Sequence, residues 1–272
     1  PGPHGFVLGL ALSVASTVVL LRGLESADLL STPSGRVAVG WLVVEDILTV
    51  VVLVVIPALS SESASSGAFG LALAIGTAVL RVSALVGVVF VVGSRVVPWI
   101  LVRVARLQSR ELFTLTVLAI TVAIAAGAAV YFGASVALGA FLAGMVVGQS
   151  RVAQQAAADA LPLRDAFAVL FFVSVGMLFE PTFVIQQPAL LASALAVVLA
   201  GKPLAALMVV SVLGYSVRTA LVVAAGLSQV GEFSFILGAL GRHHGLLSDT
   251  GYNLIVATAL VSITVNPLLF QG

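Results

Sequence analysis

Long apolar runs, each about the length of a bilayer crossing, dominate this 272-residue sequence. Hydrophobic residues make up 61% of the chain, charged residues only 8%, and the mean hydropathy is +1.23. Since a soluble domain carries roughly 25% charged residues, this composition predicts an all-α membrane protein with many spans. Gly, Pro and charged residues divide the runs into nine expected spans, at residues 5–24, 37–59, 67–97, 112–131, 133–149, 165–179, 188–213, 217–241 and 251–270.

Several classes of protein are disfavoured by the same composition. The net charge is only +1 and the basic residues are scattered, so no nucleic-acid partner is expected. The chain has no cysteine, which excludes a disulfide framework or a thiolate metal site within it. It begins at Pro1 without Met and ends just after an apolar run, so we expect a fragment of a longer protein.

Arginine residues alternate between successive expected loops. Loops after the second, fourth and sixth spans have none, and the weak exception is Arg242 before the last span. The positive-inside rule therefore predicts that the arginine-bearing loops are cytoplasmic, with the sequence starting outside and ending inside. The arginines of the four predicted cytoplasmic loops are Arg22 and Arg36; Arg95, Arg103, Arg106 and Arg110; Arg151 and Arg164; and Arg218.

Two adjacent acids, Glu45 and Asp46, fall near the middle of the span at 37–59. Each charge at the bilayer centre costs about 2.5–3.5 kcal/mol on insertion scales. Neighbouring side chains on a helix project about 100° apart, so one partner cannot easily neutralise both. Uncompensated carboxyls inside a membrane indicate an ion or proton pathway.

Other polar residues are expected at the same depth: Lys202, which is the chain's one lysine, Glu232, Arg81, and the pair Ser16 and Thr17. The alternative interpretation is structural, with buried ion pairs that only hold helices together. For Arg81 that interpretation is favoured, because a long arginine can pair at a helix crossing or reach the interface.

Two spans have the small and polar residues of interrupted helices: LSVASTVVL in the first and GLSQVGEFSF in the eighth. Paired interrupted helices are typical of a transporter binding site at the membrane midplane. Close packing through small residues is the alternative. It better explains GASVALGAFLAGMVVG (133–148), where we expect a packing seam of Gly139, Ala143 and Gly144.

Taken together, these stretches resemble the Kef-like branch of the monovalent cation:proton antiporter-2 family, within the sodium/hydrogen exchanger superfamily. The resemblance covers essentially the whole chain, in order. The matching stretches are LSVASTVVLLRGL (12–24), GWLVVEDILTV (40–50), ALGAFLAGMVV (137–147), LPLRDAFAVLFFVSVGMLF (161–179), GKPLAAL (201–207) and GLSQVGEFSFILGALG (226–241).

The resemblance implies an inverted-repeat antiporter fold with two crossed discontinuous helices, and about nine of about thirteen transmembrane helices present. Residues 1–60 and 188–272 would form the core, ion-transport part, 61–111 a linking helix and loop, and 112–187 the dimerisation part. It further implies a homodimer in a bacterial inner membrane, with a cytosolic nucleotide-binding regulatory domain possible in the full-length protein.

The resemblance also assigns roles to individual residues. Asp46 matches the acid that binds the proton and the alkali cation, with Glu45 beside it and Ser16 and Thr17 at the first helix break. Lys202 matches the core lysine that pairs with an acid, while Gln229 and Glu232 match the second break. An acid at position 45, where Gln or Asn is common, leaves the stoichiometry open.

These assignments predict a secondary antiporter, not an enzyme, that exchanges K⁺ or Na⁺ for H⁺ by alternating access and needs no cofactor. An alkali cation prefers oxygen ligands, which Asp46, the Thr17 hydroxyl and main-chain carbonyls could supply. Two alternatives stay open: a non-transporting membrane sensor or subunit with the same fold, and an organic-anion symporter using Arg81 or Lys202, which the adjacent acids disfavour.

Overall fold

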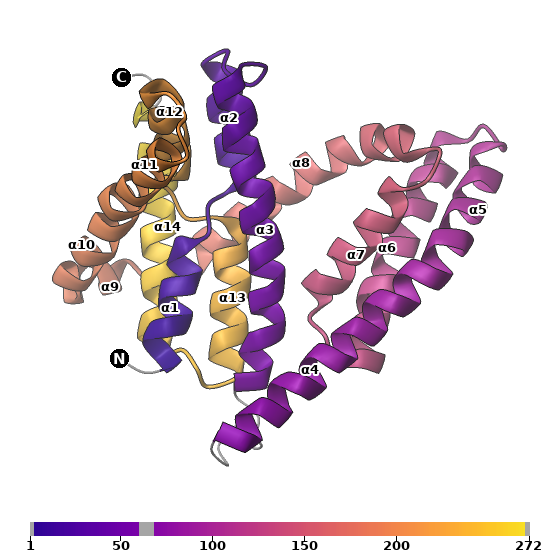
Figure 1. Cartoon of the computed structure of the whole chain (residues 1–272), viewed down its shortest axis with the longest axis horizontal. Helices are drawn as coiled ribbons and strands as arrows, with labels where there is room; N and C mark the ends of the chain where they lie inside the picture. The colour runs from indigo at the N-terminus through magenta and orange to yellow at the C-terminus, as the bar shows by residue number, and fades with distance from the viewer. Residues whose placement is uncertain (1–2, 60–67, 270–272) are drawn as a thin grey trace. The chain divides into compact units, whose positions relative to one another are not determined.

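The computed structural model describes residues 3–59 and 68–269, and these form helices joined by short connections (Figure 1). No strand occurs in that part of the chain. The helices are α1 (Pro3–Ser13), α2 (Thr17–Ser26), α3 (Pro33–Leu59), α4 (Ala68–Val88), α5 (Ser94–Ala105), α6 (Arg110–Phe132), α7 (Val136–Gly148), α8 (Ala153–Met177), α9 (Pro181–Gln186), α10 (Pro188–Ala196), α11 (Lys202–Val212), α12 (Val217–Leu227), α13 (Glu232–His243) and α14 (Asp249–Leu269), with π-helical segments at Val89–Gly93 and Val197–Gly201.

Seven of the nine predicted spans have counterparts that are long and apolar enough to cross a membrane, and the bent pair α12–α13 corresponds to an eighth. Within the described residues there are seven such segments, and an eighth if the bent pair α12–α13 is one span. The expected span at 133–149 corresponds to α7, which has only 13 residues and is too short by this measure. The multi-pass all-α prediction is therefore confirmed, with seven or eight candidate spans among the described residues where about nine were predicted. The predicted start of the third span, residue 67, and the end of the ninth, residue 270, lie outside the described residues.

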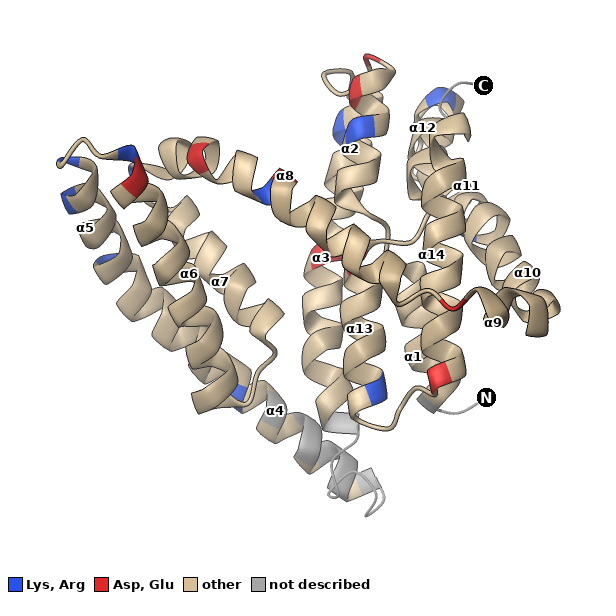
Figure 2. Cartoon of the chain, turned by 180° about the vertical axis from the view of Figure 1, so that it is seen from behind, with Lys and Arg blue, Asp and Glu red and all other residues tan. Residues whose placement is uncertain are grey.

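Several predicted helix ends were wrong, because hydropathy marks the apolar centre of a helix and not where its backbone hydrogen bonds stop. The third span continues through α5 to Ala105, so Arg95 and Arg103 lie in a helix rather than in a loop. Helix α8 begins at Ala153, twelve residues before the predicted start at 165, and includes Arg164. Figure 2 nevertheless shows most charged residues at or near helix ends, as expected for helices that cross an apolar layer.

The chain divides into two compact units, one of residues 1–52 and 175–272 and the other of residues 53–174. The predicted core and dimerisation parts had boundaries at residues 60, 111 and 187. The division concerns only which residues pack together, so the roles of the two parts stay predictions.

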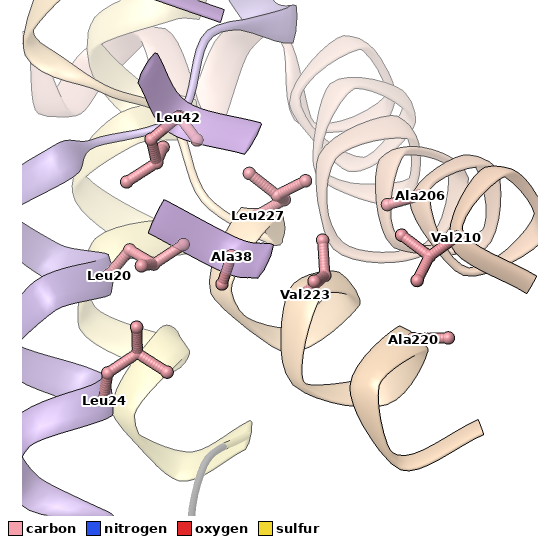
Figure 3. Close-up of a cluster of buried hydrophobic side chains, with 10 residues drawn as sticks. Leu20, Leu24, Ala38, Leu42, Ala206, Val210, Ala220, Val223 and Leu227 are labelled. Atoms are coloured by element: carbon pink, nitrogen blue, oxygen red, sulfur yellow. The ribbon is translucent and has the colours of Figure 1, made fainter. Parts of the chain in front are cut away.

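In the first unit, α2, α3, α11 and α12 meet around a cluster of buried apolar side chains (Figure 3). Leucines from α2 and α3 lie against alanines and valines from α11 and α12. Small residues at such a junction let helix backbones approach closely, which is how helices gain van der Waals contact in lipid. The buried members are Ala15, Leu20, Leu24, Ala38, Leu42, Ala206, Val210, Ala220, Val223 and Leu227.

In the second unit, α6 and α7 pack side by side and α5 lies against both. A Cβ at Gly139 would lie 2.6 Å from the Cβ of Ala128 and 2.7 Å from the Cα of Ala125, so the close approach of α7 to α6 requires glycine there. Ala143 is fully buried, as a seam residue should be. A Cβ at Gly144 would meet nothing within 4 Å, so Gly144 does not belong to the seam, contrary to the sequence prediction.

Candidate functional site

Two helix breaks, one between α1 and α2 and one between α12 and α13, lie against each other in the first unit. The non-helical residues 14–16 face residues 228–231, where α12 and α13 bend by 48°. The amide of Gly231 donates to the carbonyl of Val14 at 2.9 Å. A Cβ on Gly231 would lie 2.4 Å from the carbonyl oxygen of Ala15, so only glycine allows this approach. The two discontinuous helices predicted from the sequence therefore meet at their breaks.

Gln229 supplies hydrogen bonds that the broken helices lack. Its side chain is completely buried. Its Oε1 accepts from the amide of Ser16 at 3.0 Å, and its Nε2 donates to the carbonyls of Ser16 at 3.1 Å and Gly226 at 3.2 Å. Since buried main-chain groups need partners, this side chain satisfies both breaks at once.

Helix α14 supports the second break with polar residues that the sequence analysis did not identify. The Ser262 hydroxyl accepts from the amide of Val230 at 3.2 Å. The Asn266 side-chain amide donates to the carbonyl of Ala225 at 2.8 Å and to the hydroxyl of Ser228 at 3.2 Å. Ser262 and Asn266 are four residues apart, and this helical spacing of polar residues in an apolar run was the available signal.

The Glu45 carboxylate is surrounded by donors from several elements. Oε1 accepts a hydrogen bond from the amide of Ala15, and Oε2 accepts from the indole Nε1 of Trp41 at 3.0 Å. The ammonium of Lys202 lies 3.9 Å from Oε1 and donates to the carbonyl of Gln229 at 3.1 Å. The exposed fractions of the Glu45 and Lys202 side chains are only 15% and 13%. This ion pair thus joins α3 and α11 to both breaks.

Lys202 follows the π-helical segment Val197–Gly201 directly. Pro203 comes next and has no amide hydrogen, so the ordinary helical bond to the carbonyl of Leu199 cannot form. A local widening of the helix is a recognised result of such a lost bond. It changes the direction in which the following side chain projects.

Asp46 has different surroundings from Glu45. Its Oδ2 accepts from the Thr17 hydroxyl at 3.3 Å. Its Oδ1 is buried and accepts no hydrogen bond from the residues that the structure describes, and the same holds for Oε2 of Glu232. The negative charges of Glu232 and Glu45 act on Asp46. A buried carboxylate oxygen with no donor is unfavourable unless it binds a proton or a cation.

Glu232 and Ser16 occupy helix ends. Glu232 is the first residue of α13, at the positive end of that helix dipole. The Ser16 hydroxyl caps α2 by accepting from the amide of Val19 at 3.3 Å. It forms no hydrogen bond with Asp46 in the described structure, whereas Thr17 does. Thr17 is therefore brought to Asp46, and Ser16 contributes through its main chain to the contact with Gln229.

Arg81 lies near the start of the apolar segment Val79–Ala105 and not midway along it. Its guanidinium is exposed and lines a small cavity with Tyr131, Phe132 and Gly133, at the end of α6 rather than midway along that helix. The linking helix continues to Ala105, which moves its centre away from Arg81. No carboxylate of the described residues lies within 4.0 Å of the guanidinium, so the structural ion pair stays a prediction.

A cavity of about 940 Å³ runs along α3 in the first unit, from its first turn to Leu48. Arg36 and Tyr215 line it near the ends of α3 and α11, and Glu45 and Lys202 line it deeper along these helices. Asp46 does not line it. Among the described residues, no three His, Asp or Glu side chains come together as in a resident metal site.

Comparison with known proteins adds a family and several relatives. A family model described as "Sodium/hydrogen exchanger, transmembrane" matches residues 3–271. A candidate cation/proton antiporter of Escherichia coli (strain K12), YbaL, is 52% identical over 98% of this chain and 48% of its own length. K(+) efflux antiporter 4 of Arabidopsis thaliana is 31% identical over 98% of this chain and 45% of its own length. This chain thus spans about half the length of these relatives.

Proposed function

Because the chain belongs to the family of transmembrane sodium/hydrogen exchangers, we propose that it carries the exchange site of a secondary antiporter for a monovalent cation and protons. The relatives named above are described as cation/proton and K⁺ efflux antiporters, which are transporters and not enzymes. The name of the Arabidopsis relative specifies K⁺ and the family description names sodium, so K⁺ and Na⁺ are both candidates for the cation. Alternating access, in which the site opens to each side in turn, is the mechanism we infer.

One observation carries the proposal, and it concerns the two carboxylate oxygens of Asp46. One oxygen accepts a hydrogen bond from the Thr17 hydroxyl, and the other is buried and has no donor among the described residues. A proton or an alkali cation at that oxygen would remove the cost of the unpaired charge, and only one of them fits at a time. The Thr17 hydroxyl and main-chain carbonyls released at the first break could complete the oxygen ligands of a cation. Competition for a single acid couples the two fluxes.

In this scheme Glu45 and Lys202 remain paired with each other and do not bind the transported ions. The two opposite charges lie 3.9 Å apart and add no net charge to the site. Lys202 also donates to the carbonyl of Gln229, so the pair couples Asp46's helix to the second break. We infer that this pair stabilises the site and that Asp46 does the exchange.

The cavity along α3 supports access to this region from one side. It extends from the first turn of α3, beside Arg36, to Glu45 and Lys202. By the positive-inside rule, the Arg36 end would be cytoplasmic. We propose that it is part of the water-filled path by which ions reach the region from the cytoplasm.

The membrane location and the assembly of the protein are proposed from its membership of the same family. We infer a multi-pass location in a bacterial inner membrane, a homodimer, and a cytosolic nucleotide-binding regulatory domain in the full-length protein. The organic-anion symporter is the less favoured candidate, because an anion near Asp46 would meet the charges of Glu45 and Glu232 as well.

The test uses the full-length protein in everted membrane vesicles with an imposed pH gradient. K⁺, Na⁺ and Li⁺ are added in turn, and the collapse of the gradient is followed with a pH-sensitive dye. We expect K⁺ or Na⁺ to collapse the gradient and Asp46→Asn to abolish the response.

The matched control is Asp165→Asn, since Asp165 is an exposed acid paired with Arg164 on α8. It should exchange like the unaltered protein. An Asp46→Asn variant that still exchanges would refute the assigned role of this acid. A response to organic acids in place of cations would favour the symporter.

A further inference from the structure

Glu45 and Asp46 are adjacent acids whose carboxylates differ in how firmly they are held. Both oxygens of Glu45 accept N–H bonds, from Ala15 and from Trp41, and Lys202 lies beside one of them. Asp46 has one hydroxyl donor and one oxygen without a donor among the described residues. The Glu45 carboxylate is therefore held in place, whereas the Asp46 carboxylate has an oxygen available to bind a proton or a cation.

Trp41 is the one side chain of α3 that takes part in holding the Glu45 carboxylate, among the residues that the structure describes. It lies four residues earlier, so its ring is one turn along the same face of the helix. Its Nε1 is 3.0 Å from Oε2 of Glu45, and its ring lines the large cavity together with Glu45 and Lys202. The indole has only a donor to offer, which suits an ionised carboxylate that only accepts.

The Ala15 amide and the Lys202 ammonium both approach Oε1, the second carboxylate oxygen of Glu45. Ala15 is a main-chain donor from the first break, and Lys202 comes from α11. If the indole N–H were removed, Oε2 would keep no donor among its described neighbours. The carboxylate could then rotate, either toward the cavity or away from Lys202.

We propose that Trp41 is a positioning residue of the exchange site. Its indole N–H holds Glu45 beside Lys202 and the first helix break, so that Glu45 is a fixed counter-charge and Asp46 alone exchanges its ligand. This assignment rests on the proposed exchange function, and it deepens that function by separating the tasks of the two acids.

The first test is spectroscopic and needs no transport. The chain has two tryptophans, so Trp99→Phe leaves Trp41 as the single indole. Trp99 is exposed and stacks with Arg103 in the second unit. Ultraviolet resonance Raman of this variant in detergent or vesicles should show a strongly hydrogen-bonded indole N–H. Adding Glu45→Gln should weaken that bond, and adding Asp46→Asn should leave it unchanged.

The second test measures exchange in vesicles with Trp41→Phe, which keeps an aromatic ring and removes the N–H. Loss of a hydrogen bond to a charged group predicts an increase of about tenfold in the apparent KM for the cation, with a smaller change in maximal rate. In a Glu45→Gln background the same substitution should have little further effect, because Trp41 acts through Glu45. Trp99→Phe is the matched control and should leave KM unchanged.

Two results would overturn the proposal. One is an indole signal that does not respond to Glu45→Gln. The other is a Trp41→Phe effect on KM that is absent, or that simply adds to the effect of Glu45→Gln. If the unaltered protein exchanged no cation at all, the proposed function would fail, and the Raman comparison would still decide whether Trp41 holds Glu45. A Trp41→Phe variant that fails to fold leaves the same Raman comparison to decide.

Discussion

Glu45 and Asp46 are neighbours in the sequence, yet their carboxylates meet different partners. Side chains one residue apart on a helix point about 100° apart, so one acid faces the donors of Trp41 and Ala15 while the other faces Thr17. Helical geometry alone predicted that one partner could not serve both acids. Which partner each acid met depended on how α2, which carries Thr17, and α11, which carries Lys202, pack against α3.

At the same scale, substitution of Gln229 should lower the stability of the protein more than substitution of any other neutral side chain of the site. Gln229→Leu would remove the acceptor of the buried Ser16 amide and the side-chain donor to the buried Gly226 carbonyl, while the Ser16 carbonyl would keep the amide of Leu20. Each buried group left unpaired costs about 1–3 kcal/mol, so we expect the free energy of unfolding to fall by about 2–5 kcal/mol. Thermal unfolding of the purified protein in detergent would measure this as a lower Tm.

The control for this prediction is Gln155→Leu on α8, where the glutamine is exposed. Its Tm should stay close to that of the unaltered protein. Equal Tm values for the two variants would mean that the hydrogen bonds of Gln229 add nothing to stability.

At the scale of elements, α14 acts as a support for the interrupted helix α12–α13. Ser262 accepts from Val230, and Asn266 donates to Ala225 and Ser228. A break in a helix frees main-chain groups that lipid cannot satisfy, so a neighbouring helix has to supply the partners. This explains why polar residues recur at four-residue spacing in an otherwise apolar helix.

Ser262→Ala tests this support directly. The buried amide of Val230 would lose its acceptor, and the free energy of unfolding should fall by about 1–3 kcal/mol. Thr264→Ala on the same helix is the comparison, because Thr264 is exposed and its hydroxyl donates only to the carbonyl of Leu260 one turn earlier. Chemical or thermal unfolding that ranks Thr264→Ala as the more damaging change would count against the support role.

At the scale of the whole molecule, the two compact units differ in which buried polar and charged groups they contain. The unit of residues 1–52 and 175–272 contains both helix breaks, the ion pair of Glu45 and Lys202, and Asp46. In the other unit, the ion pair of Arg110 and Asp159 lies at the first turn of α6. Among the described residues, the two helix breaks and the pair of Glu45 and Lys202 thus lie in one unit, while the second unit has a buried carboxylate oxygen without a donor on Asp159.

If the proposed exchange function is right, cation exchange should depend on pH in one direction. A proton and a cation would then compete for Asp46, and a bound proton would have to leave before the cation binds. As pH falls through the range in which Asp46 takes up its proton, the apparent KM for the cation should rise by about tenfold per pH unit. As pH rises above that range, KM should become constant.

Dye-based exchange measured at several cation concentrations and several pH values would provide these KM values. Asp165→Asn, the exposed control, should follow the same curve. A KM that does not change with pH across the active range would contradict competition at a single acid.

The sequence by itself determined the membrane class, the approximate positions of the apolar helices, the two interrupted helices and the polar residues to examine. These features follow from local composition and helical spacing, which need no knowledge of distant contacts. For the same reason the sequence analysis misjudged helix ends, placed Arg81 midway along its span and included Gly144 in a packing seam.

Only the tertiary structure decided which polar groups meet. The two breaks contact each other, Glu45 is held between Trp41, Ala15 and Lys202, and Ser262 and Asn266 support the second break. These contacts join residues far apart in the sequence, such as Ser16 and Gln229, which are 213 positions apart. The physical reason is that a buried main-chain or carboxylate group must find its partner within the protein when lipid offers none. A hydropathy pattern records which residues avoid water, and it holds no information on which distant donor satisfies which acceptor.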